Sequence, residues 1–408
     1  MIQLYTMAFR SLARNKRRTF FSMLALALGL ALLLLMAAFI KGELEGSRES
    51  SIRLTSGHLQ VRAETYNINQ SNLAWKDLIE NPEIISEQLE TLPPVSAATP
   101  RLFASGIAAS GDESLGVQIM GVDPPSEANN PYREGLISGE FLESSDREGV
   151  LIGKPLAEQF NLGPGDSINL LISTSDGEID EQLFTVRGVY TTQTSSLDKA
   201  TILMPFSKAQ SITRTENHAS LIFVLLEDSD QAGAVSVAIQ SGDYKILTWE
   251  EMNELLNTIE DIYINYIFIF YLIILAITAT VIINTLIMSV YERTREIGIL
   301  SAIGMRSGRI MAMFFAETSI LAVGGIILGL IIGGITIWYT SRTGFYIGDM
   351  GLSATSEFIM GDTIYPKWAL SDTISLSALS FIITIIAGLF PALTAARMEP
   401  VTALRGGK

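Results

Sequence analysis

The segment from Glu292 to Ile310, ERTREIGILSAIGMRSGRI, combines alternating charges, aliphatic side chains and three glycines between two long apolar runs. The chain holds no cysteine, which excludes disulfides and thiolate metal sites, and its two histidines, His58 and His218, are far apart in sequence. These histidines are better interpreted as ordinary surface or packed residues than as ligands. No catalytic constellation is visible, so the chemistry that this segment can supply is recognition.

A short amphipathic helix is predicted from Thr294 to Ile303. Ile297, Leu300 and Ile303 lie close to one apolar stripe, and Gly304 suits the C-terminal cap. Such a helix can rest among lipid headgroups with its basic neighbours facing anionic lipid. It can equally dock in a groove of a partner protein, where glycines permit close approach. The residues alone leave both alternatives open.

Four apolar runs must position this helix. The chain has 408 residues, of which 48% are hydrophobic and 17% charged, so membrane segments are expected. Each run lacks acidic and basic residues and can cross a hydrocarbon core of about 30 Å as a helix. The first follows RNKRR but is too long for a signal peptide and has no clear cleavage site, so an uncleaved span is predicted. The runs are Thr19–Ile40, Ile262–Tyr291, Thr318–Ser341 and Thr373–Ala396.

Charge predicts the orientation. Residues 1–18, 292–317 and 397–408 together hold 12 Lys or Arg and 4 Asp or Glu, whereas residues 41–261 hold 14 and 35. The positive-inside rule therefore places both termini and the 292–317 link in the cytoplasm. The acidity of residues 41–261 argues against nucleic acid as a partner.

Residues 41–261 alternate short strands and helices without a long βα period, so an α+β extracytoplasmic domain is expected between the first and second spans. Near its end, Thr248 and Glu251 form a capping-box pattern. One helix is predicted from about Trp249 to Tyr291, and its outer part would form a stalk. The apolar stripe of this stalk is Met252, Leu255, Leu256 and Ile259.

The third span carries Gly325, Gly329 and Gly333 at steps of four, which predicts a smooth face where another helix packs closely. Glu317, at the start of this span, is expected to pair with a base such as Arg309 or Arg397.

The motif REIGILSAIG, together with the ending PALTAARMEPVTALR and the beginning AFRSLARNKRRTFFSMLALALGLAL, resembles the FtsX-like permeases, which include the macrolide-exporter and lipoprotein-releasing ABC transporters. SGHLQV, TPRLFASG, IMGVDPPSE and GVLIGKPLAEQFNLGPGD are most similar in style to the lipoprotein-releasing branch. The resemblance covers nearly the whole chain. It implies that the short helix couples the chain to an ATPase through Arg295, Glu296, Ile297, Gly298, Leu300, Ile303 and Gly304.

In this interpretation Glu296 sets the polar register, while Ile297, Leu300 and Ile303 dock through apolar contact. Gly298 and Gly304 allow close approach and end the helix. The implied segments are an amphipathic N-terminal helix (1–18), the four spans (19–40, 262–291, 318–341, 373–396), the extracytoplasmic domain (41–261, stalk from about 249), the coupling helix with the start of the third span (292–317), an extracytoplasmic loop (342–372) and a cytoplasmic tail (397–408).

The resemblance also implies partners: two copies of a cytoplasmic ABC ATPase, a second permease chain in a homo- or heterodimer, membrane lipid, and a lipoprotein or periplasmic carrier. No phosphate-cradling G-x-x-x-x-G-K-[ST] motif is present, so ATP and Mg²⁺ are expected on a separate ATPase subunit, with no cofactor and no enzyme activity in this chain.

The predicted function is that of an inner-membrane permease that converts ATP hydrolysis into movement of its extracytoplasmic domain, for release or export of lipoproteins or other amphiphiles. Two alternatives stay open within the family, namely a relay that activates a cell-wall hydrolase and an efflux permease for peptides or drugs. A receptor or adhesion protein without an ATPase is the third alternative, and the complete coupling motif argues against it.

Overall fold

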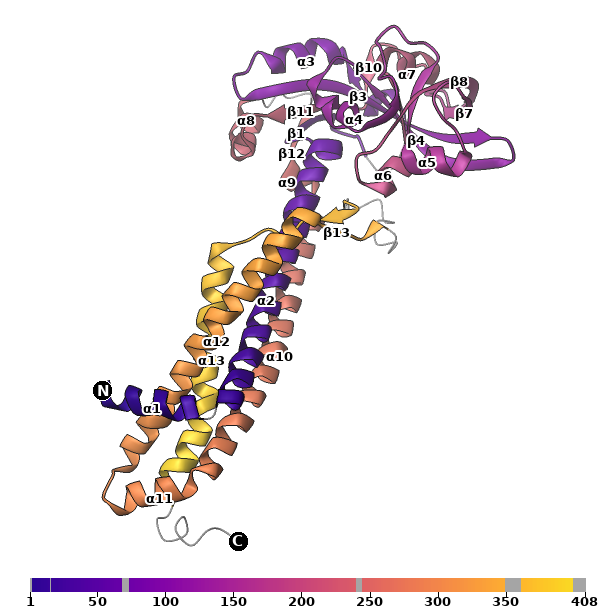
Figure 1. Cartoon of the computed structure of the whole chain (residues 1–408). Helices are drawn as coiled ribbons and strands as arrows, with labels where there is room; N and C mark the ends of the chain where they lie inside the picture. Colours follow the sequence, from indigo (N-terminus) through magenta and orange to yellow (C-terminus); the bar gives the residue numbers. More distant parts are fainter. Residues whose placement is uncertain (1, 15, 68–72, 240–243, 349–360, 399–408) are drawn as a thin grey trace. The chain divides into compact units, whose positions relative to one another are not determined.

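The computed structural model describes residues 2–14, 16–67, 73–239, 244–348 and 361–398. The chain divides into two compact units (Figure 1). The helix bundle comprises residues 1–43, 260–345 and 365–408, and the large domain comprises residues 44–259 and 346–364.

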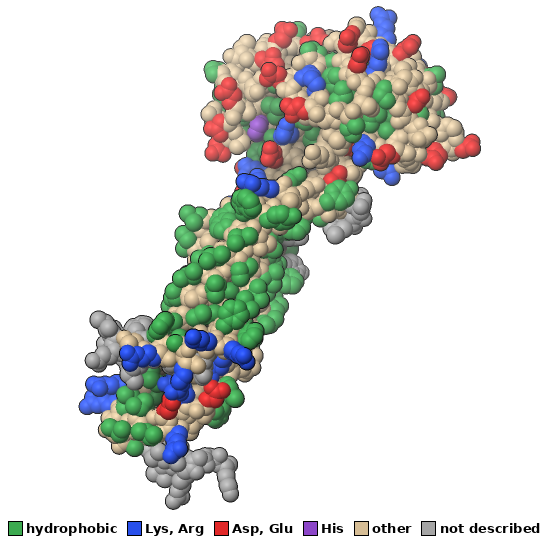
Figure 2. Space-filling view, viewed as in Figure 1, with side chains coloured by type: hydrophobic (Ala, Val, Ile, Leu, Met, Phe, Trp, Pro, Cys, Tyr) green, Lys and Arg blue, Asp and Glu red, His purple; other side chains and the backbone are tan. Residues whose placement is uncertain are grey.

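In the bundle, long helices lie side by side, and α2, α10, α12 and α13 are each long and apolar enough to cross a membrane (Figure 1). Apolar side chains cover much of the bundle surface in view (Figure 2). These helices contain the predicted runs, which confirms the expected class of four membrane helices. The bounds are α1 Ile2–Arg14, α2 Lys16–Ser51, α10 Glu254–Glu292, α11 Thr294–Ala302, α12 Ser307–Thr343 and α13 Leu370–Ala396.

The glycines of the third span lie on the face of α12 that packs on α2. A Cβ atom built at Gly325 would lie 2.6 Å from Cδ2 of Leu26, and one at Gly329 would lie 3.0 Å from the carbonyl oxygen of Ala27. Gly333 is similarly close to α2. Larger side chains would therefore push these two helices apart.

The predicted unbroken helix from Trp249 is wrong at Asn253. The capping box of Thr248 and Glu251 is present and starts α9, but α9 ends after four residues and α10 begins at Glu254. Asn253 leaves helical geometry, with φ −112° and ψ 34°, and both its backbone nitrogen, at 3.0 Å, and its side-chain nitrogen, at 2.8 Å, donate to the carbonyl oxygen of Trp249. The predicted single helix is therefore divided into two helices, α9 and α10.

The predicted stalk stripe is described only at Met252, which is half-buried and whose Sδ accepts a hydrogen bond from Arg62 at 3.4 Å. The side chains of Leu255, Leu256 and Ile259 lie outside the described residues.

The first layer of the large domain is a four-stranded antiparallel sheet in the order β12, β1, β11 and the first half of β3. Helices α3 and α8 contribute Leu89, Ala232 and Val235 to its core, together with Val61 and Ile222 of the strands. The bounds are β12 Tyr244–Thr248, β1 Leu59–Ala63, β11 Leu221–Leu226, β3 Val95–Ser110, α3 Pro82–Glu90, α8 Ala232–Ile239 and α9 Trp249–Met252.

The second half of β3 belongs to a closed barrel. β3 pairs with β4, followed in turn by β9, β6, β8 and β7, and β7 pairs back with β3. The β4–β9 and β6–β8 pairs are parallel and the others antiparallel. Residues such as Ile119, Ile152 and Leu170 fill a buried apolar core. The bounds are β4 Glu113–Val122, β9 Thr201–Pro205, β6 Gly149–Gly153, β8 Ile179–Tyr190, β7 Ser167–Ser173, α5 Lys154–Phe160, α6 Ser195–Ala200 and α7 Phe206–Thr213.

Smaller elements complete the large domain, and their mixture with the sheets confirms the predicted α+β class. They are α4 Asn130–Glu134, β5 Leu136–Gly139, β2 Ile79–Glu80, β10 His218–Ala219 and β14 Thr363–Ile364, while β13, Phe345–Tyr346, has one residue in the range of each unit.

The segment before the fourth span is bonded to α6. Ser195 donates to the Asp362 carboxylate from its backbone nitrogen at 3.1 Å and from its hydroxyl at 2.6 Å. The backbone nitrogen of Asp362 donates to the carbonyl oxygen of Gln193 at 2.7 Å. Residues around Asp362 thus belong to the large domain.

Candidate functional site

Two local signals define the limits of α11. Arg293 leaves helical geometry, with φ −105° and ψ 9°, and separates α10 from α11. At the other end Gly304 has φ +96°, a conformation that favours glycine. The backbone nitrogens of Gly304 and Met305 donate to the carbonyls of Ser301 and Leu300, both at 3.0 Å, which is a Schellman motif. The predicted termination at Gly304 is confirmed.

The apolar side chains of α11 divide into two faces. Ile297 is 1% exposed and packs with Ile310 and Phe314 of α12, whereas Ile299 is 44% and Ile303 79% exposed. Leu300 is half-buried between them.

The predicted single stripe of Ile297, Leu300 and Ile303 is therefore wrong. At about 100° per residue, Ile303 is turned by about 120° from Ile297 but by only about 40° from Ile299. Ile297 anchors α11 in its own bundle, and Ile299 and Ile303 are the exposed pair.

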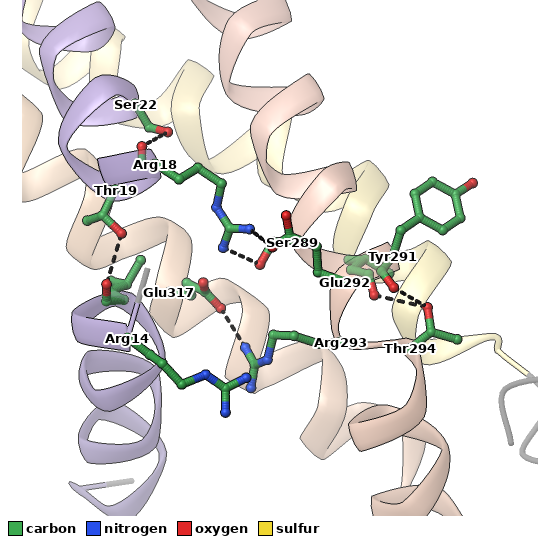
Figure 3. Close-up of polar contacts among 12 residues, drawn as sticks. Arg14, Arg18, Thr19, Ser22, Ser289, Tyr291, Glu292, Arg293, Thr294 and Glu317 are labelled. Carbon is green, nitrogen blue, oxygen red and sulfur yellow. Dashed lines mark hydrogen bonds and ion pairs between the residues drawn. The ribbon is translucent and has the colours of Figure 1, made fainter. Parts of the chain in front are cut away.

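Charged side chains connect α11 to two other helices. The Arg293 guanidinium contacts the carboxylates of Glu296 at 3.1 Å and Glu317 at 3.3 Å. Glu296 also contacts Arg14 of α1 at 2.6 Å. Figure 3 shows Arg293 reaching Glu317 on α12. The expected pairing of Glu317 with Arg309 or Arg397 is corrected to Arg293, because the turn between α10 and α11 brings Arg293 onto α12.

Glu317 is 1% exposed, and the Arg293 guanidinium at 3.3 Å compensates its charge. Glu296 is more open, and the hydrogen bond from Arg14, followed by that from Arg293, lowers the pKa of its carboxyl. The Glu296 carboxylate is thus occupied within the chain, where it ties α11 to α1 and to the turn.

The start of α2 is joined to the end of α10 in the same region. Arg18 contacts the Glu292 carboxylate at 2.5 Å and donates to the Ser289 hydroxyl at 2.9 Å (Figure 3). Thr294 Oγ1 donates to the carbonyl of Tyr291 at 2.9 Å and thus satisfies one group at the end of α10. The turn therefore has contacts to α1, α2 and α12.

Basic side chains gather at the same end of the bundle, in blue in Figure 2. On α11 and just after it, exposed Ile299 and Ile303 lie close in sequence to exposed Arg295 and Arg306. The exposed basic residues of α1, the start of α2 and the α11–α12 region are Arg10, Arg14, Lys16, Arg17, Arg295, Arg306 and Arg309.

Of the predicted coupling residues, Arg295, Ile303 and Gly304 are exposed, whereas Gly298 is buried with Ile297. Sequence reasoning did not select Arg14, Arg293 or Ile299. The spacing of Arg293 three residues before Glu296 is a helical pair signal that could have identified it. Within the described residues, no group of three or more His, Asp or Glu side chains could hold a metal ion.

Comparisons with known proteins identify the family of the chain. A MacB-like periplasmic core domain matches residues 19–241, and an FtsX-like permease C-terminal domain matches residues 268–400. Together the fold and these matches define a permease subunit of an ABC transporter. The chain belongs to the family of permeases with a MacB-like periplasmic core domain and an FtsX-like C-terminal domain.

Relatives include a LolC transmembrane protein of a lipoprotein-releasing system from Neisseria meningitidis, 22% identical over 97% of this chain and 96% of the relative. A macrolide export ATP-binding/permease protein MacB from Wolinella succinogenes is 25% identical over 98% of this chain, which spans 60% of that longer protein. An uncharacterized ABC transporter permease from Methanocaldococcus jannaschii is 24% identical over 69% of each chain.

Proposed function

We propose that the chain couples ATP hydrolysis by a separate cytoplasmic ATPase to movement of its large domain. The termini and α11 lie in the cytoplasm, two permease chains pair with two ATPase copies, and the protein resides in a bacterial inner membrane. ATP and Mg²⁺ bind to the separate ATPase in this proposal.

The exposed face of α11 carries this proposal. Ile299 and Ile303 stand next to exposed Arg295 and Arg306, on a helix whose opposite side is fixed by Ile297. An apolar pair of this kind on a rigidly seated helix suits a groove on a partner. A helix resting in lipid would need no ion-paired connection to its own bundle.

Movement of α11 would reach the rest of the chain through Arg293. This residue lies in the turn that follows α10 and pairs with Glu317 of α12. Helices α10 and α2 have 39 and 36 residues and run without interruption into the large domain. Both are longer than the about 20 residues that a membrane requires, so each can transmit displacement beyond it.

We further propose that the cargo is a lipoprotein or another amphiphile. The LolC relative, which matches nearly end to end, belongs by name to a lipoprotein-releasing system. The alternative of drug or peptide efflux is suggested by the MacB relative, which is named for macrolide export. By its name that relative also includes an ATP-binding part in the same chain.

Replacing Ile303 with Glu tests the docking face. We expect Ile303→Glu to reduce co-purification of the ATPase and to abolish transport-linked ATP hydrolysis, because it places a charge in the apolar centre of the contact. Val237→Glu, on the exposed surface of α8, is the matched control and should retain both. Pull-down from membranes followed by ATPase assay measures the two variants.

Retained ATPase binding in Ile303→Glu with normal coupled hydrolysis would overturn the docking role of α11. A bound lipoprotein in the purified wild-type complex supports release, whereas a bound cell-wall hydrolase supports the relay alternative.

A further inference from the structure

The large domain contains an arginine whose charge has no carboxylate partner among the described residues. Arg101, on β3, is 0% exposed. Its Nη1 donates to the carbonyl oxygen of Leu54 at 2.8 Å, and its guanidinium lies 3.6 Å from the ring centre of Phe223. Its Nε and Nη2 atoms have no hydrogen-bond partner in the described part of the chain.

Burial of a cation normally costs several kcal/mol unless it is compensated, and burial lowers the pKa of Arg101 to about 10. The group therefore remains charged at neutral pH. An apolar side chain of similar volume would fill the core at lower cost. The location of the group that Arg101 binds, the carbonyl oxygen of Leu54, therefore indicates what the arginine does.

Leu54 lies at the end of the first membrane helix. Helix α2 continues directly into a π-helix, Ile52–Ser56, and the last carbonyls of a helix lack partners and carry the negative end of its dipole. Tyr132 also donates to the Leu54 carbonyl, at 3.3 Å, and Gln60 donates to that of Thr55 at 2.7 Å. Three side chains of the large domain, which we call the socket (Gln60, Arg101 and Tyr132), thus hold the end of this helix.

Arg101 occupies a particular place in β3. It pairs with Leu221 as the last contact of β3 with β11 in the four-stranded sheet, and the next residue, Leu102, pairs with Gly121 at the start of the barrel. Arg101 therefore stands where one strand passes from the first sheet to the second. A displacement applied there acts on both layers.

We propose that Arg101 is a positioning residue that clamps the end of α2 to this strand, so that motion of the first span becomes motion of the four-stranded sheet against the barrel. This inference rests on the proposed coupling function. It assigns to the first span a route into the large domain that is separate from the second span and α9.

A distance measurement between the two layers tests the clamp. The chain has no cysteine, so two introduced cysteines take spin labels specifically. Val237→Cys on α8 and Leu183→Cys on β8 are exposed positions in the two layers. In the full permease reconstituted with its ATPase, we expect ATP with vanadate to change the distance between the labels.

In this labelled background Arg101→Met should lose the nucleotide-dependent change while unfolding temperature and ATPase binding stay close to those of the parent. Arg101→Lys, which keeps one donor and the charge, should restore part of it. Arg187→Met, at an exposed arginine of the barrel, is the control and should keep the full change. If Arg101→Met does not fold, Tyr132→Phe removes the second donor to the same carbonyl and should reduce the change.

The outcomes separate the two proposals. If the parent shows no nucleotide-dependent change, the proposed coupling function fails. If the parent changes and folded Arg101→Met changes equally, the clamp is overturned and coupling stands; a full change in Tyr132→Phe does the same where Arg101→Met is unfolded.

Discussion

Arg293 in the bundle, 12% exposed, and Arg101 in the large domain, 0% exposed, both contact the end of a helix through their guanidinium groups or backbone neighbours, but their charges are compensated differently. Arg293 contacts two carboxylates, Glu296 and Glu317, whereas Arg101 contacts a carbonyl oxygen and an aromatic ring. Removing one partner of an ion pair leaves the other charge without its counterion, whereas removing Arg101 takes away a cation and leaves a carbonyl oxygen with one donor fewer. We therefore expect the loss of Arg293 to destabilise the protein more than the loss of Arg101.

The largest expected effect on stability comes from removing the ion-paired guanidinium of Arg293. Arg293→Met leaves Glu317 buried without its guanidinium, and we expect the free energy of unfolding to fall by about 3–5 kcal/mol. Thermal or denaturant unfolding of the full-length protein in detergent measures this loss. Arg295→Met, at the exposed arginine two residues later, is the control and should change little.

A double variant sharpens this result. Arg293→Met combined with Glu317→Gln removes both charges and should recover part of the lost stability. An additive loss in the double variant would contradict the role of the pair.

The buried carboxyl of Asp198 on α6 predicts a pH dependence. Burial raises the pKa of the Asp198 carboxyl to about 6 from the ordinary 3.8, despite hydrogen bonds from Thr192 and Thr191. Its contribution to stability is present below the unfolded-state pKa and is lost as pH rises through about 6. A shift of this size corresponds to about 3 kcal/mol.

Unfolding of the full-length protein between pH 4 and pH 7 measures this contribution as the difference between wild type and Asp198→Asn. The difference should shift against the wild type as pH rises. A pH-independent difference would show that Asp198 stays ionised throughout.

The stability of the protein should change little when Arg101 is replaced. Arg101→Met replaces a cation that has no carboxylate partner among the described residues by an apolar side chain of similar length, and we expect the free energy of unfolding to change by less than about 1.5 kcal/mol. The same unfolding assay measures it. A loss of stability as large as that of Arg293→Met would remove the distinction between the two arginines.

The smallest effect is expected at Glu296. Its contact with Arg14 is solvent-exposed on both sides, so Glu296→Gln should cost less than about 1 kcal/mol. Because the pair connects α11 to α1, we expect the rate of coupled ATP hydrolysis to fall clearly while the free energy of unfolding changes little. Parallel unfolding and ATPase measurements on this variant compare the two.

Much of the fold follows from patterns in the sequence. The apolar runs identify the membrane helices, and alternating or β-branched stretches such as SINLLIS and SLIFVLLE, which are typical of strands, lie in β7 and β11. The long strand β3 was not predicted, because VSAATPRLFASGIAAS is rich in small residues and contains a proline. Its strand conformation comes from pairing with β11, β4 and β7, which are distant in sequence.

The candidate site was predicted less completely. The location of α11 and its end at Gly304 follow from local signals, but the division between Ile297 and Ile303 depends on which side of the helix meets α12. Likewise the break at Asn253, where φ is −112° and ψ 34°, interrupts an otherwise good helical pattern that contains no glycine or proline. Long-range ion pairs such as Arg14 with Glu296 have no sequence signature.

The bonds of Asp362 to Ser195 bring the segment between α12 and α13 into the large domain. The large domain is therefore connected to the spans by three separate stretches of polypeptide. The first span leads into it, the second span follows it, and the segment with Asp362 contacts it between the third and fourth spans. Proteolytic cleavage of that segment would leave every span inserted but remove one of the three connections, and Asp362→Ala would release the segment without cleavage.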